Sequence, residues 1–197
     1  MARRLDCPVL LTSTVAKGFG RGATLLGCPT ANMPLAELGA DAVAALGTGI
    51  YACWAQVLDG DGANSGWGGA GAARSPSGAR VFKAVTSVGW NPYFDNKEKT
   101  VEPHIMHAFD DDFYGCRLKL LVCAYLRPEK NFESMQALID AIQDDIRNTD
   151  DVLDRAEYAS LRSHEFFDEE EDSRSQDRRA LTLGFGLAGL AAFLASR

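Results

Sequence analysis

Residues 117–146 mark the point at which the chain changes from strand to helix, and they read RLKLLVCAYLRPEKNFESMQALIDAIQDDI. The run up to residue 126 is short, rich in apolar residues and bounded by turn residues, which is typical of a β-strand. After Pro128 the apolar residues recur at intervals of three, four and seven, which is the period of an α-helix with one apolar face. The sequence therefore predicts a β-rich domain that ends in a helix.

The predicted helix has an apolar stripe and a polar face. The polar face carries Asp140, Asp144 and Asp145, and either Asn131 or Ser134 is expected to cap the first turn. The apolar stripe consists of Phe132, Met135, Leu138, Ile139, Ile142 and Ile146. A second, shorter helix is expected over 151–161.

Ahead of this helix, the chain alternates between short β-rich runs and turn residues, as antiparallel sandwiches and barrels do. Strands are expected at 9–15, 49–58, 80–88, 101–109 and 117–126. Residues 59–79 are dominated by Gly, Ala and Ser, so we expect a mobile loop that joins two strands.

Length, composition and charge exclude several classes of protein. With 197 residues, 46% of them hydrophobic and 24% charged, the chain fits one globular domain with extensions rather than a disordered, collagen-like or polytopic membrane protein. The net charge of −7 lies in the last third, because residues 1–130 carry +1 and residues 131–197 carry −8. Neither part has the excess of Lys and Arg that nucleic-acid binding requires.

The five cysteines are odd in number and show no C-x-x-C spacing, which disfavours a zinc site or a disulfide framework and favours a reducing, intracellular compartment. No secretory signal is recognised at the start of the chain, so a cytoplasmic location is expected. The acidic run at 169–172 belongs to an expected linker, 168–179.

Residues 180–197 form a hydrophobic tail. Its uncharged stretch, 180–196, would span about 26 Å as a helix, slightly less than the ~30 Å of a bilayer's hydrocarbon core. The sequence leaves two interpretations open: an anchor in an intracellular membrane facing the cytosol, or a helix docked on the domain.

Two short motifs suggest a site for phosphates. The sequence GFGRG at 18–22 lets backbone N–H groups turn toward an anion, and Arg21 adds positive charge. Its spacing is that of neither a P-loop nor a dinucleotide fingerprint, so by itself it favours a tight turn. Downstream, Thr30 and Asn32 lie two apart and share one face of an extended chain. Their neutral oxygens suit Mg²⁺ beside phosphates, although hydrogen bonding within a turn is the simpler alternative.

A third motif, VEPHIMH at 101–107, supplies a candidate base. Strand alternation places Glu102 beside His104 on one face and His107 on the other. A glutamate in this position can accept a proton from a hydroxyl nucleophile. For the two histidines a structural hydrogen-bonding role is favoured. Pro103 lacks a backbone N–H, so it predicts an edge strand or a bend.

Seven motifs follow one another along roughly residues 8–148: GFGRG (18–22), LG and PTAN (26–32), TGIY (48–51), SVGWNPY (87–93), EPHIMH (102–107), DFYG (112–115) and YLRPEKNF (125–132). Together they resemble the riboflavin kinase family, of the eukaryotic monofunctional type. The resemblance implies a mainly β fold, a six-stranded antiparallel Greek-key barrel with C-terminal helices, over residues 1–167. It also implies transfer of the γ-phosphoryl group of ATP to the 5′-hydroxyl of riboflavin, giving FMN and ADP, by a protein expected to be a monomer.

The resemblance assigns roles to individual residues. Glu102 matches the catalytic carboxylate. Thr30 and Asn32 match ligands of Mg²⁺, with Mn²⁺ or Zn²⁺ left open as the metal. Arg127, Lys130 and Phe132 match residues that bind the flavin. The nucleotide side comprises Gly18, Arg21, Thr24, Thr30, Asn32, Ile105 and His107, of which Arg21 is assigned on its charge alone. Five aromatic residues are candidates either for the flavin ring's surroundings or for the barrel core: Tyr93, Phe94, Phe113, Tyr114 and Phe132.

The chain departs from the family pattern in three places. Thr24 stands where the family commonly has a lysine. Pro103 directly follows Glu102 and removes a backbone donor there. The 59–79 insertion and the tail beyond about Phe167 have no counterpart in the compact domain. No nucleotidyltransferase domain precedes the kinase motifs, so FAD synthesis is not expected. The alternative function is an inactive flavin-binding or scaffold module tethered by its tail, against which the intact Thr30, Asn32 and Glu102 argue.

Overall fold

The computed structural model describes residues 2–16, 30–58, 73–74, 80–90, 99–109 and 112–168. The glycine-rich motif at 18–22, Thr24, the hydrophobic tail and nearly all of the 59–79 insertion lie outside these residues. Among the helices that are described, none is long and apolar enough to cross a membrane. The membrane anchor at 180–197 therefore stays a prediction.

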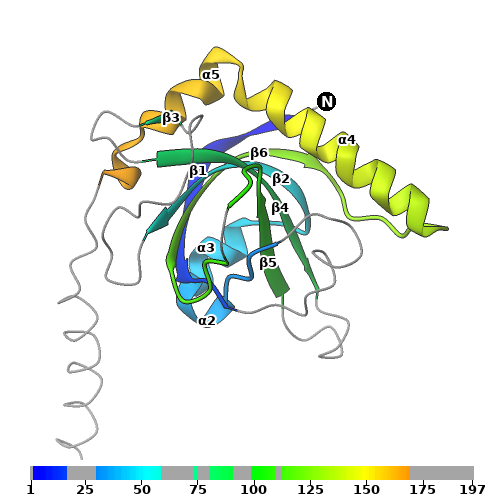
Figure 1. The fold of residues 1–197 in the computed structure, drawn as a ribbon, viewed down its shortest axis with the longest axis horizontal. Helices are drawn as coiled ribbons and strands as arrows, with labels where there is room; N and C mark the ends of the chain where they lie inside the picture. The colour runs from blue at the N-terminus through cyan, green and yellow to red at the C-terminus, as the bar shows by residue number, and fades with distance from the viewer. Residues whose placement is uncertain are drawn as a thin grey trace, which may run out of the picture.

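The fold is mainly antiparallel β-sheet with helices at its C-terminal end (Figure 1). The long strands are β1 (Arg3–Thr14), β2 (Gly49–Leu58), β4 (Arg80–Trp90), β5 (Lys99–Ile105) and β6 (Arg117–Arg127). They pair in the order β1-β6-β2-β4-β5, and the two-residue strand β3 (Ala73–Arg74) pairs with the start of β4. All five expected strands are thus confirmed, although some of their ends differ.

Two strand ends were wrong for identifiable reasons. β1 begins at Arg3 rather than residue 9, and the register with β6 shifts between Arg4 and Val9, which accommodates Pro8 on an edge strand. β5 ends at Ile105 rather than residue 109, because the backbone turns there and the N–H of His107 bonds to the carbonyl of Ile105 at 2.8 Å. His107 is therefore not part of the strand.

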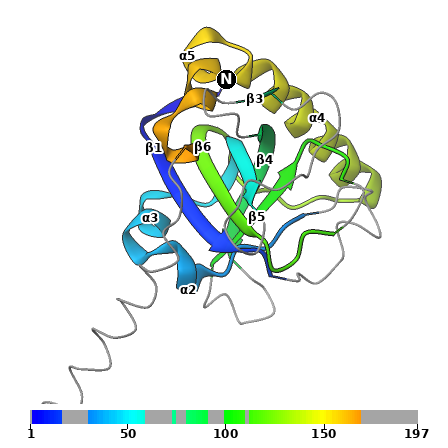
Figure 2. The ribbon, with the colours of Figure 1, turned by 60° about the vertical axis from the view of Figure 1, so that its left-hand side comes forward.

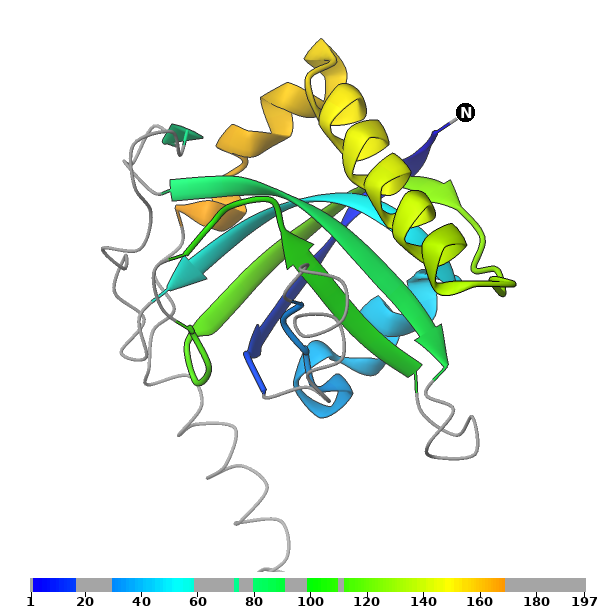
Figure 3. The same ribbon diagram turned by 45° about the vertical axis from the view of Figure 1, so that its right-hand side comes forward.

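The two edges of the sheet, β1 and β5, approach each other through the segment 30–33 (Figure 3). Single bridges join Ala16 to Asn32 and Met33 to Val101. These are isolated pairs and not a sixth long strand in the described part of the chain. The fully closed six-stranded barrel remains a prediction.

The concave side of the sheet holds the main core. Val101 and Ile105 of β5 are 0% and 4% exposed and belong to it, together with Leu11, Cys53 and Val88. Glu102 and His104 are consequently on the opposite face of β5, as the alternation predicted. Two short helices that were not expected, α2 (Leu35–Leu38) and α3 (Ala40–Ala45), lie at one end of the sheet (Figure 2).

The outer face of β2 and β6 is covered by the C-terminal helices α4 (Met135–Leu153) and α5 (Ala156–Ala159) and the 3₁₀ turns η2 (Ser160–Ser163) and η3 (Glu165–Phe167). The indole Nε1 of Trp54 donates to the carbonyl of Tyr158 at 2.9 Å across this interface. The second helix was expected to begin at residue 151, but α4 continues to Leu153.

Helix α4 begins as predicted but packs on a different face. Ser134 is the cap, since its Oγ accepts a hydrogen bond from the N–H of Ala137 at 3.1 Å. The buried positions, Ala141, Asp145, Thr149, Val152 and Leu153, are centred about a quarter-turn away from the apolar stripe. Met135, at the start of that stripe, is 51% exposed. Asp145, which was assigned to the polar face, is instead 5% exposed.

Candidate active site

Four side chains form a row across four neighbouring strands. Arg127 of β6 is paired with Ile50 of β2, Ile50 with Ser87 of β4, and Ser87 with Glu102 of β5. All four line one pocket of about 240 Å³. Because paired strands lie about 4.8 Å apart, the backbone at Arg127 and that at Glu102 are separated by roughly 14 Å. The row therefore forms an elongated floor with a cation at one end and a carboxylate at the other.

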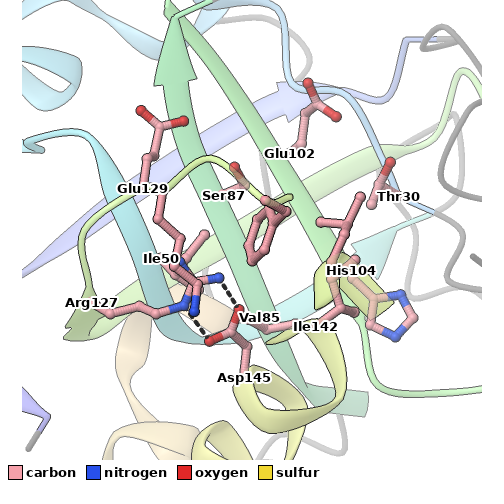
Figure 4. A pocket seen from close by; sticks show the side chains of 13 residues that line it. Thr30, Ile50, Val85, Ser87, Glu102, His104, Arg127, Glu129, Ile142 and Asp145 are labelled. Carbon is pink, nitrogen blue, oxygen red and sulfur yellow. Dashed lines mark hydrogen bonds and ion pairs between the residues drawn. The ribbon is translucent and has the colours of Figure 1, made fainter. Parts of the chain in front are cut away.

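The walls of this large pocket come from parts of the chain that are distant in sequence (Figure 4). Val85 and His104 extend the floor. Helix α4 contributes Leu138, Ile142 and Asp145, and the loop after β6 contributes Glu129, Lys130 and Phe132. The pocket is thus enclosed between the outer face of β4 and β5, the helix and the loop.

Backbone hydrogen bonds place the segment 30–33 beside Glu102. The N–H of Ala31 donates to the carbonyl of Pro103 at 2.9 Å, and the N–H of Met33 donates to that of Val101 at 3.0 Å. By this register Asn32 lies opposite Glu102. Pro103 has no N–H to return to Ala31, so the pairing cannot form a full ladder there. The predicted edge position of Pro103 is confirmed, since β5 pairs with β4 alone among the described strands.

A second, small pocket of about 40 Å³ adjoins the large one at Thr30, which lines both. Its other lining residues are Val15, Ala31, Ile105, His107, Phe109, Asp112, Phe113 and Tyr114. The rings of His107, Phe82 and Phe109 pack against one another, with the His107 centroid 4.7 Å from that of Phe82 and 4.9 Å from that of Phe109. Within the described part of the chain, the buried Nε2 of His107 has no hydrogen-bond partner. This pocket therefore offers mainly aromatic and apolar surface.

Arg127 is held by an ion pair with two parallel hydrogen bonds. Its Nε donates to Oδ1 of Asp145 at 2.7 Å, and its Nη2 donates to Oδ2 at 2.6 Å. A third bond runs from Nη1 to the carbonyl of Pro128 at 2.9 Å. The register between β2 and β6 shifts next to Arg127, leaving Leu126 without a partner on β2. Such a bulge re-aims the side chain that follows it.

Glu129 packs against the backbone of β4 at Gly89, where a Cβ atom would overlap its carboxylate. Burial raises the pKa of Glu129, and the nearby charge of Arg127 acts in the opposite direction. The glycine in the SVGWNPY motif thus provides room for a carboxylate at the wall of the large pocket.

The structure brings most of the predicted site residues together. Glu102, Arg127, Lys130 and Phe132 line the large pocket, Ile105 and His107 line the small one, and Thr30 lines both. Asn32 lies opposite Glu102 but lines neither pocket. Gly18, Arg21 and Thr24 lie outside the described residues, as do Tyr93 and Phe94. Phe113 and Tyr114 line the small pocket and not the one that contains Phe132.

Sequence reasoning missed several lining residues of the large pocket, chiefly Ser87, Glu129 and Asp145. Asp145 follows Leu138 by seven residues and Ile142 by three, and these spacings place all three on one side of a helix. The sequence could therefore have predicted that Asp145 lies near them. Ser87 required the register between β4 and β5. Among the described residues, no three His, Cys, Asp or Glu side chains form a cluster able to hold a metal ion.

Comparisons with known proteins agree with this geometry. The family model for riboflavin kinase (flavokinase) matches residues 5–153. The chain is 42% identical over 163 residues to the riboflavin kinases of Mus musculus and Homo sapiens, which covers 81% of this chain and 90% of each relative. It also resembles the crystal structure of riboflavin kinase from Trypanosoma brucei, with a TM-score of 0.61 and 26% identity over 85% of this chain and 93% of that one. The chain therefore belongs to the riboflavin kinase family, as its ordered motifs predicted.

Proposed function

We propose that this chain phosphorylates the 5′-hydroxyl of riboflavin with ATP, and that the large pocket binds riboflavin while the small pocket binds the nucleotide. Riboflavin kinase activity follows from the family. The division of the site is supported by one observation above all: two pockets of different character meet at Thr30, next to the strand that carries Glu102. A donor and an acceptor must meet at such a junction for direct group transfer.

The large pocket has the character that riboflavin requires. Its middle is apolar, with Ile50, Phe132 and Ile142, which suits a flat aromatic ring. Polar groups lie at both ends of the floor, Arg127 at one and Glu102 at the other. We place the ring toward Arg127 and the ribityl chain toward Glu102, because only the latter end borders the second pocket.

The small pocket is suited to a nucleotide base. Phe109, Phe113 and Tyr114 supply aromatic surface, and Tyr114 is 47% exposed and so accessible to a ligand. The His107 ring, packed against Phe82 and Phe109, adds to this surface. Ile105 and His107 thereby retain the nucleotide-side roles that the resemblance implied.

Glu102 is the proposed general base. Its carboxylate takes the proton of the 5′-hydroxyl as the oxygen forms a bond to the γ-phosphorus, and the bond from that phosphorus to the β–γ bridging oxygen breaks. FMN and ADP are the products, and the proton passes from Glu102 to solvent. Phosphoryl transfer demands mainly positioning, which the paired strands provide by fixing Glu102 between Ser87 and Asn32.

Thr30 and Asn32 fit a hard divalent cation. Ala31 and Met33 are buried, so the alternating residues Thr30 and Asn32 point away from the core on the side of Glu102. Their hydroxyl and amide oxygens are ligands that Mg²⁺ accepts beside phosphates and water. When bound, Mg²⁺ neutralises charge on the transferring phosphate. Mn²⁺ and Zn²⁺ are the alternatives.

The test is FMN formation from riboflavin, ATP and Mg²⁺, followed by chromatography with fluorescence detection. The parent protein is expected to form stoichiometric FMN and ADP. Riboflavin binding without any FMN would refute the proposal and indicate an inactive flavin-binding module instead. We place the catalytic domain at 1–167, since the last described element ends at Phe167.

A further inference from the structure

The Arg127–Asp145 ion pair is unusual among the ion pairs of the described residues because both partners line the large pocket. Asp145 is 5% exposed, and the Arg127 side chain is 23% exposed. Burying two charges costs desolvation free energy that their attraction only partly offsets, so such a pair is a weak source of stability. Its location calls for a role in the site.

The geometry points to Asp145 as a positioning residue for the acceptor: it fixes the Arg127 guanidinium and, through the Pro128 carbonyl, the loop that carries Glu129, Lys130 and Phe132. This inference rests on the proposed function, since it assumes that the large pocket binds riboflavin. It assigns to α4 a part in substrate recognition and not only in covering the sheet.

The hydrogen bonds of Arg127 leave defined donors for a ligand. A guanidinium has five N–H groups, and three are used: one on Nε and one on Nη2 toward Asp145, and one on Nη1 toward Pro128. The two that remain, one on each terminal nitrogen, have no partner among the described residues. They lie at the tip of the side chain, where a ligand oxygen can reach them.

The charge of Asp145 determines whether the two remaining donors of Arg127 suit a charged or a neutral ligand oxygen. An unpaired arginine in a pocket is a phosphate site, because its fork matches a phosphate's oxygens. Here the carboxylate of Asp145 already neutralises the guanidinium, so the two remaining donors suit a neutral carbonyl or hydroxyl oxygen. The far end of the pocket therefore recognises an uncharged acceptor, while the phosphates belong at the Thr30 end.

The Arg127–Asp145 ion pair also sets the position of the loop after β6. The bond from Arg127 Nη1 to the Pro128 carbonyl fixes the first residue of that loop. Beyond it, Glu129 packs on Gly89, and the Lys130 ammonium lies 5.2 Å from the centroid of the Phe132 ring. Without Asp145 the guanidinium can rotate, and the three pocket residues that follow lose their common anchor.

The experiment compares Asp145→Ala and Asp145→Asn with the parent full-length chain. Both are expected to raise the riboflavin KM, and the riboflavin Kd measured by fluorescence titration without ATP, by about 10- to 100-fold, the range for removing a partner that orients a ligand-binding group, as at metal sites. The ATP KM is expected to stay within twofold, and kcat within about threefold. Asp145→Glu, which keeps the charge, is expected to recover part of the riboflavin affinity.

Asp150→Asn is the matched control. Asp150 lies on the same helix and forms an ion pair of 2.6 Å with Lys83 of β4, but it does not line the pocket. This variant is expected to lower stability with the riboflavin KM unchanged within twofold. An unchanged riboflavin KM in both Asp145 variants, or an equal rise in the KM of riboflavin and ATP, would overturn the inference.

The two proposals fail in different ways. If the parent makes no FMN, the proposed activity is wrong. The riboflavin Kd values of the Asp145 variants still test the positioning role of Asp145, because binding is measured without turnover. If Asp145→Ala does not fold, Asp145→Asn keeps the side-chain volume and one acceptor oxygen, and its riboflavin Kd then decides the matter.

Discussion

Replacing Glu102 with Gln tests the central step of the proposed reaction. The two side chains have nearly the same shape, so the row formed by Arg127, Ile50 and Ser87 is expected to keep its register. The substitution replaces the proton-accepting carboxylate with a neutral amide of nearly the same size. A positioned general base contributes about 10²- to 10⁴-fold to a rate, which corresponds to about 2.7 to 5.5 kcal/mol of transition-state stabilisation.

This loss is expected in kcat and not in riboflavin binding. Glu102 is at one end of the row, roughly 14 Å from Arg127, so the other end of the pocket is unaffected. The riboflavin Kd is therefore expected to stay within about threefold of the parent value, and the melting temperature within about 2 °C. Single-turnover FMN formation at saturating ATP, with fluorescence titration of riboflavin, separates the two quantities.

His104 provides the matched control. It lies two residues along the same face of β5, lines the same pocket and also has a side chain able to accept a proton. His104→Gln is expected to keep kcat within about fivefold. If Glu102→Gln retained parental turnover, or if His104→Gln lost as much as Glu102→Gln, the assignment of the base to Glu102 would be refuted.

Three further predictions concern stability, pH and the tail. Trp54→Phe removes the hydrogen bond from the indole N–H to the Tyr158 carbonyl, so thermal unfolding is expected to show a loss of about 1 kcal/mol, or roughly 2–4 °C in Tm. Because burial raises the pKa of Glu129, the folded state favours the protonated form of this side chain. The stability that this preference contributes is present at low pH and is lost as the pH rises above 4.5, the ordinary pKa of a glutamate. Glu129→Gln is therefore expected to raise Tm at pH 7 but not at pH 4. Removing residues 175–197 is expected to leave Tm and FMN formation unchanged within twofold, since the described elements end at Phe167; loss of folded protein would show that the tail packs on the domain.

Much of the strand content could be predicted because alternation is a local property. Val101 and Ile105 are apolar, Glu102 and His104 are not, and this pattern alone assigns the two faces of β5. The packing of α4 could not be predicted in the same way. Its buried face includes Asp145, a charge that becomes tolerable only beside Arg127, which precedes it by 18 residues. The apolar stripe then belongs partly to the pocket, through Leu138 and Ile142.

Residues of the candidate site could be predicted only where they belong to a recognisable sequence motif. Glu102, Thr30 and Arg127, all of which line the large pocket, were singled out because they stand in recognisable sequences. Ser87 stands in the SVGWNPY motif but was given no role, because its place beside Glu102 depends on the register between β4 and β5, which is a non-local property. Phe113 and Tyr114 were left between the flavin side and the barrel core for the same reason: nothing local shows that their loop reaches Ile105 and His107, where Phe113 also packs against the main core.

The register of β5 links the stability of the core to the chemistry of the site. Val101, at 0% exposed, is paired with Val88, and Ile105, at 4% exposed, is paired with Ala84, all four on the core side of the sheet. A slip of one residue would turn Glu102 into this apolar core and Val101 toward the pocket. Burying an unpaired carboxylate there costs several kcal/mol, and exposing Val101 to the pocket adds the free energy of its removal from the core. The packing of Val101 and Ile105 therefore holds Glu102 beside Ser87 and opposite Asn32, so that the position of the proposed base is fixed by residues that never touch the substrate.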